Sequence, residues 1–301
     1  MNKITAIGEI LFDIYPGSKK MGGAPLNFLY HIYKFTGAGN IISRIGNDTL
    51  GEEILQFLKR SNISSHYVQI DQKYPTGIAE VDLNEKNEPS FIIESNRAYD
   101  FIETNNNLHK LIEESTDCLY FGSLAQRYEV TRNTIHSLMG KNIKYFCDLN
   151  IRQNFYNEEI IIKSLAAADI LKVNIDEIKL LNDLLIKENF DLEKSSAKLI
   201  NKFDIKLLAV TKGAEGSILI KDKIIDEFKV DPFEAIDTVG AGDAFAAVLC
   251  IGYLNGWELP FTNKFANRFA SEICRITGAL PGDEKIYNKL RGEFEYETGW
   301  R

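Results

Sequence analysis

The chain has 301 residues, and its 35 Lys and Arg against 43 Asp and Glu give a formal net charge of −8 at pH 7. This charge repels nucleic-acid backbones and anionic membranes, and we expect neither as a partner. The 45% hydrophobic and 26% charged residues are typical of a globular protein, and we expect a single domain over residues 1–301.

The first thirteen residues form an apolar run that Glu9 and Asp13 interrupt. Because this segment offers no cleavage site after a signal-type core, we interpret it as a first strand. The longest apolar run, residues 244–254, is far shorter than the roughly 20 residues that a membrane-spanning helix needs. We therefore expect a cytoplasmic protein.

Residues 76–94 consist of two alternating runs around a polar turn at 84–88, a pattern that predicts a β-hairpin apart from the helices. Together with the early segment, this hairpin is expected to form a small antiparallel sheet, the lid, over about residues 10–21 and 76–96. Such a lid can cover a binding site on the main sheet.

From about residue 105 onward, short apolar runs alternate with segments whose apolar residues recur every three or four positions. This pattern predicts a doubly wound α/β fold, with a mostly parallel sheet between layers of helices. The expected strands are 118–121, 144–149, 170–173 and 207–211. The expected helices are 130–139, 158–167, 175–185 and 192–202. A hairpin of 217–221 and 224–228 then adds antiparallel edge strands, and two long helical patterns follow it.

Four cysteines lie far apart, mostly inside apolar runs, and form no Cys-x-x-Cys pair; they are Cys118, Cys147, Cys250 and Cys274. We expect buried free thiols in a reducing compartment rather than disulfides or a metal site. The four histidines are equally scattered, so their spacing indicates no zinc site.

The strongest motif is residues 237–245, a glycine-flanked turn that opens directly into an apolar helix. Its glycines let a ligand approach the backbone, and the first amides of the helix favour an anion such as a phosphoryl group. We expect the helix dipole to keep Asp243 ionised, so that its carboxylate can accept a proton from an attacking hydroxyl, as phosphoryl transfer requires. The alternative interpretation is that Asp243 or Asp237 merely caps the helix.

A second glycine pair, Gly22 and Gly23, also precedes a helix, and Pro25 suits the first turn of that helix. The glycines permit close approach of a polyhydroxylated ligand, and Asn27 can both donate and accept hydrogen bonds. The alternative is a simple turn with a helix cap.

Three polar clusters follow expected strands, at residues 148–152, 174–177 and 211–216. Ligands of open α/β sheets bind at the carboxyl ends of the strands, where these clusters should converge. Arg152 suits a phosphate, and Asn174 and Glu177 suit a hydrated Mg²⁺. The loop at 211–216 suits a nucleotide. The chain has neither a P-loop nor a Gly-x-Gly-x-x-Gly motif after its first strand, which weakens Walker-type NTPases and nicotinamide-dependent reductases as candidates.

Together these motifs resemble the ribokinase-like (PfkB) carbohydrate kinases, and the resemblance extends from about residue 3 to residue 290. The matching segments are 8–13, 22–27, 44–48 with Gly51, 148–152, 174–177, 211–216 and 237–243. The last of them is the family's signature. The resemblance implies a ribokinase-like fold and ATP-dependent phosphorylation of a sugar hydroxyl.

The resemblance also implies roles for individual residues. The transferred phosphoryl group would meet Asp243 as base, the amides of Gly240, Ala241, Gly242 and Asp243 as anion hole, and Arg152. The sugar would contact Asp13, Gly22, Gly23 and Asn27, and ATP would contact Asn174, Thr211, Gly213, Gly216 and Asn267. Mg²⁺ would lie near Asn174 and Glu177, the latter through water. A monovalent cation, with K⁺ as the candidate, would lie in a loop of Asp237, Val239 and Ala279.

Within the family, the opening segment and the glycine pair look most like bacterial fructokinases, which favours D-fructose. Two features depart from that pattern, the stretch 96–100 and the Leu149 that replaces a commoner proline. Arg97 and Tyr99 would suit an acid sugar such as 2-keto-3-deoxygluconate, because a guanidinium pairs with a carboxylate, unless Arg97 is a solvated charge on the lid. A ribokinase, a nucleoside kinase and a non-catalytic sugar or nucleotide sensor stay open as alternatives. The lid is also a candidate surface for a homodimer.

Overall fold

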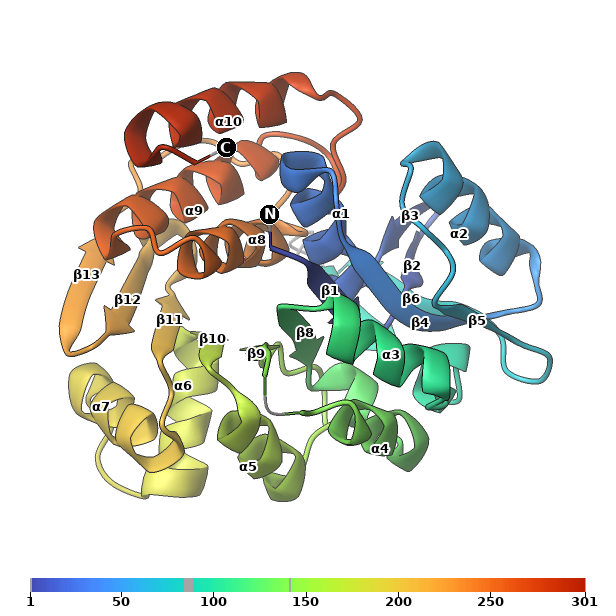
Figure 1. The fold of residues 1–301 in the computed structure, drawn as a ribbon, viewed down its shortest axis with the longest axis horizontal. Coiled ribbons are helices and arrows are strands. Elements are labelled where there is room, and N and C mark those ends of the chain that lie inside the picture. The colour runs from blue at the N-terminus through green and yellow to red at the C-terminus, as the bar shows by residue number, and fades with distance from the viewer. Residues whose placement is uncertain (1, 84–88, 141, 301) are drawn as a thin grey trace.

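A nine-stranded sheet forms the centre of the computed structural model, which describes residues 2–83, 89–140 and 142–300 (Figure 1). The strand order is β13-β12-β11-β10-β9-β8-β1-β4-β5. Neighbours pair in parallel from β11 to β5, whereas β12 and β13 add an antiparallel edge. The strands are β1 (Ile4–Ile7), β4 (Asn40–Gly46), β5 (Val68–Asp71), β8 (Cys118–Gly122), β9 (Lys144–Asp148), β10 (Ile170–Asn174), β11 (Leu207–Thr211), β12 (Ser217–Lys221) and β13 (Ile224–Phe228).

Helices cover both faces of this sheet, so the expected doubly wound α/β fold is confirmed (Figure 1). One face carries α1 (Ala24–Thr36), α2 (Thr49–Arg60), α8 (Ala241–Leu254), α9 (Leu259–Ile273) and α10 (Lys285–Thr298). The other carries α3 (Asn106–Ser115), α4 (Glu129–Ser137), α5 (Glu158–Ala167), α6 (Ile175–Leu181) and α7 (Leu192–Phe203). Residues 244–252 of α8 are all buried, which fixes the N-terminus of α8 relative to the ends of the strands.

Side-chain caps determine where several helices begin. Asp48 accepts a hydrogen bond from the Gly51 amide at 2.8 Å at the start of α2, and Asn157 caps α5 in the same way. Such caps satisfy amides that have no partner within the helix. The start of α8 differs, because its cap position is Gly240 and no side chain bonds its first amides.

The lid is a four-stranded sheet of order β3-β2-β6-β7, beside β4 and β5 in Figure 1. Its strands are β2 (Leu11–Tyr15), β3 (Ser18–Gly22), β6 (Gly77–Leu83) and β7 (Pro89–Ile93). The two hairpins are antiparallel, as expected for the lid, and they join through β2 and β6, which pair in parallel. β2 and β6 both run outward from the main sheet. Because they point in the same direction, they form a parallel pair when they lie side by side. The expected turn at 84–88 lies outside the described residues.

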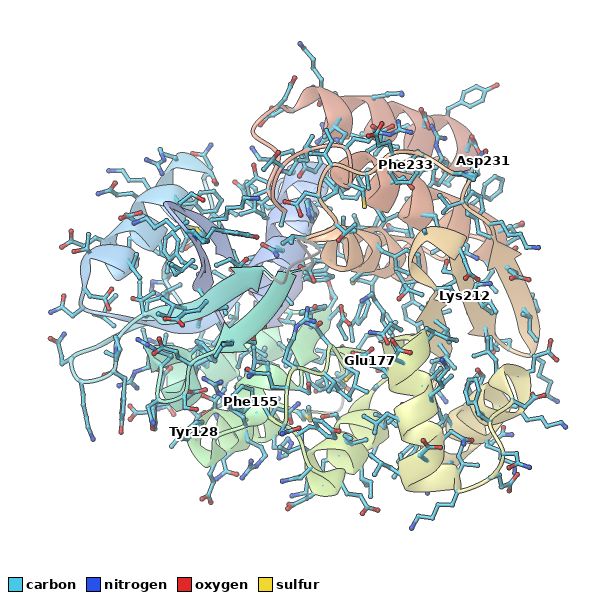
Figure 2. All side chains as sticks on the ribbon, turned by 180° about the vertical axis from the view of Figure 1, so that it is seen from behind. Tyr128, Phe155, Glu177, Lys212, Asp231 and Phe233 are labelled. Atoms are coloured by element: carbon cyan, nitrogen blue, oxygen red, sulfur yellow. The ribbon has the colours of Figure 1, made fainter. Side chains whose placement is uncertain are left out.

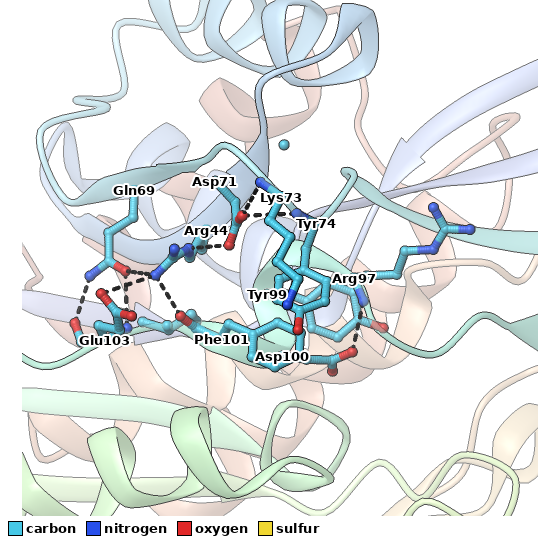
Figure 3. A network of polar contacts seen from close by, with 12 residues as sticks. Arg44, Gln69, Asp71, Lys73, Tyr74, Arg97, Tyr99, Asp100, Phe101 and Glu103 are labelled. Carbon is cyan, nitrogen blue, oxygen red and sulfur yellow. Dashed lines mark hydrogen bonds and ion pairs between the residues drawn. The ribbon is translucent and has the colours of Figure 1, made fainter.

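A polar network joins the base of the lid to the main sheet (Figure 3). Arg44 on β4 pairs through Nε with Asp71 Oδ2 at the end of β5, at 2.6 Å. The same guanidinium donates to the carbonyl of Phe101 at 2.8 Å, in the short helix η1 (Ala98–Phe101) that follows the lid hairpin. Asp71 Oδ1 accepts from the amides of Lys73 and Tyr74, just before β6. These contacts fix the segments on either side of the hairpin.

Most predicted elements after residue 105 are confirmed, and the hairpin of β12 and β13 has the expected bounds. Three helices rather than two follow it in the described part of the chain. The helix expected over 175–185 becomes α6 followed by the π-helical turn η3 (Asn182–Ile186). The four cysteines are buried free thiols, as expected. Among the described residues, no helix has both the length and the apolar character required to cross a membrane.

Candidate active site

Two cavities meet at the start of α8. The first cavity has a volume of about 270 Å³ and lies between the lid and the carboxyl ends of the strands. Its lining combines acidic, basic and apolar side chains with glycines: Glu9, Leu11, Asp13, Gly23, Ala24, Asn27, Ala79, Ile93, Leu124, Asn150, Arg152, Lys172, Thr238, Val239, Gly240, Gly242 and Asp243. The second, of about 460 Å³, is lined by Thr211, Gly213, Ala214, Gly216, Val230, Asp231, Pro232, Phe233, Ala235, Thr238, Ala241, Gly242, Phe245, Asn267, Ala270, Ser271 and Cys274. Thr238 and Gly242 line both cavities. The two cavities therefore adjoin each other beside the first turn of α8.

The first turn of α8 offers two free amides to an anion. The Ala241 amide donates to the Thr238 carbonyl at 3.3 Å, and the Asp243 amide donates to the Gly240 carbonyl at 3.1 Å. Within the described chain, the amides of Gly240 and Gly242 bond no protein acceptor. Of the four amides expected to form the anion hole, those of Gly240 and Gly242 are therefore the two that can bond an anion. Gly240 has φ +81°, and a Cβ there would lie 2.3 Å from the Cβ of Ala279, so this turn requires glycine.

Asp243 lines the first cavity from the first turn of α8. No side chain caps this helix, so the interpretation of Asp243 as a simple cap is wrong. Burial, with a further contribution from Asp148, raises the pKa of Asp243 from 3.8 to about 7. Burial therefore opposes the helix dipole, which was expected to keep this carboxyl group ionised. A carboxyl with a pKa near neutrality can both lose and accept a proton at physiological pH.

Asn27 orients this carboxyl group. Its Nδ2 donates to Asp243 Oδ2 at 2.8 Å, while its own Oδ1 is buried and without a partner among the described residues. Asn27 lies in the first turn of α1, whose cap, Gly23, has φ +106°. A Cβ at Gly23 would lie 2.5 Å from the Glu9 carbonyl oxygen, so glycine lets α1 begin directly against the cavity.

Asp13 reaches the same cavity from the lid strand β2. It is 8% exposed, and burial raises its pKa to about 6, opposed by Arg152 and Lys20. A Cβ at Gly22 would lie 3.0 Å from Asp13 Oδ2, so glycine leaves room for this carboxylate, although Gly22 does not line the cavity itself. The structure therefore brings Asp13, Gly23 and Asn27 together, as expected.

Two cations face the cavity, and the sequence analysis identified only Arg152. Lys172, a buried lysine in the middle of β10, pairs with both Asp148 oxygens at 2.9 Å. Burial alone would lower the pKa of Lys172, but Asp148 and Glu177 raise it above its usual value, so the ammonium stays charged. A Cβ at Gly242 would lie 3.4 Å from Lys172 Nζ, which places this charge beside the free amides. A lysine within an otherwise apolar strand was the signal that could have identified it.

The second cavity contains most of the residues expected to bind a nucleotide. Thr211, Gly213 and Gly216 line it from the loop after β11, and Asn267 lines it from α9. In Figure 2, Asp231 and Phe233 lie above Lys212, which follows directly on β11. Phe233, Phe245 and the aliphatic part of the lining give an apolar slot of a kind that suits a planar base.

Asn174 and Glu177 lie outside both sets of lining residues. Asn174 caps α6 through the amides of Asp176 and Glu177, and the Glu177 carboxylate accepts from the amides of Ile151 and Asn174 at 2.7 and 2.8 Å. Among the described residues, no group of three or more His, Cys, Asp or Glu side chains could hold a metal ion. Asn174 and Glu177 therefore contact the backbone around α6 and meet in neither cavity.

The carboxylate of Asp237 is occupied by protein donors. Its Oδ2 accepts from Lys20 Nζ and from the Gly278 amide, each at 2.9 Å, and its Oδ1 accepts from the Val239 amide at 3.0 Å. Although burial alone would raise it, these donors hold the pKa of Asp237 below its usual value. Lys20 comes from the lid strand β3, so its ammonium group pairs with the carboxylate that the resemblance implies as part of the K⁺ loop.

Arg97 does not line the first cavity. Its guanidinium pairs with Glu94 and its side chain is 13% exposed, so it is not a solvated charge on the lid. Figure 3 shows its backbone amide bonded to Asp100 Oδ2, at 3.0 Å, beside Tyr99. The structure therefore separates Arg97 from the other residues expected to contact the sugar.

Comparisons with known proteins agree with this geometry. Residues 4–285 match the pfkB family carbohydrate kinase model. The chain is 31% identical over 299 residues to PH1459 of Pyrococcus horikoshii, covering 92% of this chain and 91% of that protein. The structure of PH1459, described as an uncharacterized sugar kinase, has a TM-score of 0.80 at 26% identity and covers 96% of this chain and 100% of that one. PH1459 has also been solved in complex with ATP, with a TM-score of 0.77 at 26% identity and coverage of 95% and 99%.

Two fructokinases are also similar. That of Escherichia coli is 27% identical over 295 residues, which cover 92% of each chain. That of Vibrio cholerae, solved with fructose, ADP and calcium, shares the fold with a TM-score of 0.81 at 22% identity and covers 96% of this chain and 99% of its own.

Proposed function

This chain belongs to the pfkB family of carbohydrate kinases and is a sugar kinase, and we propose that it transfers the γ-phosphoryl group of ATP to a hydroxyl of D-fructose. The observation that carries this proposal is the meeting of the two cavities at Thr238 and Gly242, with Asp243 on the polar side. The first cavity would hold the sugar, and the second would hold ATP.

The transfer would proceed in one step. Asp243 accepts the proton of the sugar hydroxyl while the sugar oxygen forms a bond to the γ-phosphorus. The bond from the γ-phosphorus to the bridging oxygen breaks, and ADP leaves. The Gly240 and Gly242 amides stabilise the charge on the transferred group, and Arg152 adds positive charge from the cavity wall. Mg²⁺, when bound, neutralises phosphate charge, and Glu177 would hold it through water.

The charges in the first cavity support a neutral sugar. Its lining contains the carboxyl groups of Glu9, Asp13 and Asp243, whereas Arg97 is paired with Glu94 outside it. Arg152 and Lys172 line the same cavity, but Lys172 is paired with Asp148, so the carboxylate of 2-keto-3-deoxygluconate would meet more acidic groups than available cations. The similarity to the Escherichia coli fructokinase supports fructose among the neutral sugars.

Coupled-enzyme detection of ADP tests the substrate. Fructose, ribose, tagatose, adenosine and 2-keto-3-deoxygluconate are compared at fixed Mg-ATP, and fructose is expected to have the highest kcat/KM. A site built to bond a given hydroxyl can reject an analogue without it by roughly 10⁴-fold. The Arg97→Ala variant is the control and should keep the same order of substrates. An order led by ketodeoxygluconate that Arg97→Ala abolishes would replace fructose by an acid sugar, and an order led by ribose would make the chain a ribokinase.

The lid is also proposed as the surface of a homodimer. Ile92 on β7 is 50% exposed, and β3 and β7 are the open edges of the small sheet. Sedimentation of the wild type and of Ile92→Asp tests this proposal. A dimer that the variant dissociates supports it, and a monomeric wild type contradicts it.

A further inference from the structure

Glu9 is a buried carboxyl group in the first cavity to which the sequence analysis gave no role. It lies between β1 and β2, is 3% exposed, and lines the cavity together with Asp13, Asn27 and Asp243. Its Oε2 is buried and has no hydrogen-bond partner in the described part of the chain. Because an unpaired buried polar group is costly, it indicates a partner that is absent from the free protein.

The backbone around Glu9 is held in place from two sides. The Glu9 carbonyl lies so close to Gly23 that a Cβ there would be 2.5 Å away, and the next residue, Ile10, is fully buried. Asp13, four residues further along, enters the same cavity from β2. The segment from Glu9 to Asp13 therefore presents two carboxyl groups to one ligand.

The charge state of Glu9 is suited to bonding a hydroxyl. Burial, with a smaller contribution from Asp243, raises its pKa from 4.5 to about 7, against the opposing effects of backbone hydrogen bonds and of Arg152. Asp243 has a pKa near the same value. Near neutrality each of these groups can therefore be protonated or ionised. When Asp243 is ionised to act as base, Glu9 can keep the proton and donate a hydrogen bond.

We propose that Glu9 is a further sugar-binding and specificity-determining residue, whose carboxyl group bonds a hydroxyl of the sugar other than the one that is phosphorylated. This inference rests on the proposed function, since it places a sugar in the first cavity. The site then holds the substrate by three side chains from two segments: Glu9 and Asp13 around β2, and Asn27 on α1.

Two variants and one control test the proposal. Glu9→Leu removes the hydrogen bond and keeps a side chain of similar volume, so it should raise KM for fructose between roughly 5- and 150-fold. KM for ATP should stay within about twofold of the wild-type value, because ATP is expected in the other cavity. Glu9→Gln keeps the shape, a donor and an acceptor, and should change KM for fructose less than Glu9→Leu does. It should also shift the acid limb of kcat/KM to lower pH, because Asp243 loses a carboxyl neighbour. Glu53→Gln, which removes an exposed lid contact with Lys19, is the matched control and should match the wild type.

A series of monodeoxyfructoses separates substrate binding from a structural role. The wild type should discriminate against the sugar that lacks the contacted hydroxyl, and Glu9→Leu should lose that discrimination while keeping the others. Equal losses for every sugar, or unchanged KM values in both variants, would overturn the proposal while the kinase assignment stands. Should Glu9→Leu fail to fold, the comparison of Glu9→Gln with the wild type decides, and an unshifted pH profile with unchanged discrimination overturns the proposal. A wild type that phosphorylates no sugar in the series refutes the proposed function, and this inference with it.

Discussion

Replacing Asp243 by Asn tests whether the carboxylate acts as the base, because the fold of the site should stay the same. The substitution removes the proton acceptor and keeps the shape of the side chain. The structure predicts a fall in kcat of about 10² to 10⁴, the usual contribution of a positioned base. Asn27 still faces the amide at 2.8 Å in place of the carboxylate, so the first turn of α8 should keep its geometry.

The same substitution should stabilise the protein at alkaline pH. The folded-state pKa of Asp243, about 7, is above its usual 3.8. The native state therefore binds this proton more tightly than the unfolded state, and stability falls as pH rises from about 4 to about 7. A shift of this size corresponds to an upper limit of ~4 kcal/mol, which the partial exposure of the side chain reduces to about 1–3 kcal/mol. The Asn variant is neutral at every pH and should gain this amount at pH 8, a rise of several degrees in Tm.

Steady-state kinetics and thermal unfolding at pH 5 and pH 8 check both effects. In the wild type, kcat/KM should rise with pH through about 7, the pKa of Asp243, and this limb should be absent in Asp243→Asn. Asp222→Asn, in the exposed turn between β12 and β13 at φ +50°, is the matched control and should change neither quantity. A variant at position 243 that phosphorylates its sugar at nearly the wild-type rate would refute the role of Asp243 as base.

Three further perturbations test the surroundings of the site. Hydrogen exchange of β6 and β7 should slow on addition of sugar, because a closed lid excludes water; unchanged exchange at saturating sugar would remove the lid from the mechanism. Lys20→Met should make activity depend on K⁺, whereas the wild type should stay active in tetramethylammonium salts, because Lys20 already supplies a cation at Asp237; equal dependence in both proteins would contradict this. Lys172→Met leaves Asp148, which is 1% exposed, without its cation, and should cost about 3–5 kcal/mol in denaturant unfolding; a loss below about 1 kcal/mol, as for an exposed pair, would contradict the importance of this buried contact.

The alternation of apolar runs predicted the main sheet and most of its helices, because buried parallel strands and amphipathic helices leave regular patterns. It did not identify β4, whose apolar run Arg44 interrupts, or β5, which has only four residues and a polar Gln69 inside it. The parallel pairing of β2 with β6 could not be predicted from the sequence either. Pairing between distant segments depends on where both leave the main sheet, and no local pattern records that.

The glycine motifs predicted which loops form the site, because Gly23 and Gly240 adopt positive φ where any Cβ would clash. They could not predict the electrostatics. The raised pKa of Asp243 comes from burial and from Asp148, which is nearly a hundred residues away in the chain. The pairing of Lys20 with Asp237 likewise joins the lid to the loop before α8. Such contacts exist only in the folded chain.

Phosphorus-31 NMR of the products formed from Mg-ATP and D-fructose tests the central claim most directly, since it shows where the γ-phosphoryl group goes. We expect one sugar phosphomonoester in equal amount to ADP, formed by the wild type and lost in Asp243→Asn. Inorganic phosphate as the only product would contradict the account, because the group would then pass to water instead of to a sugar hydroxyl held against Asp243.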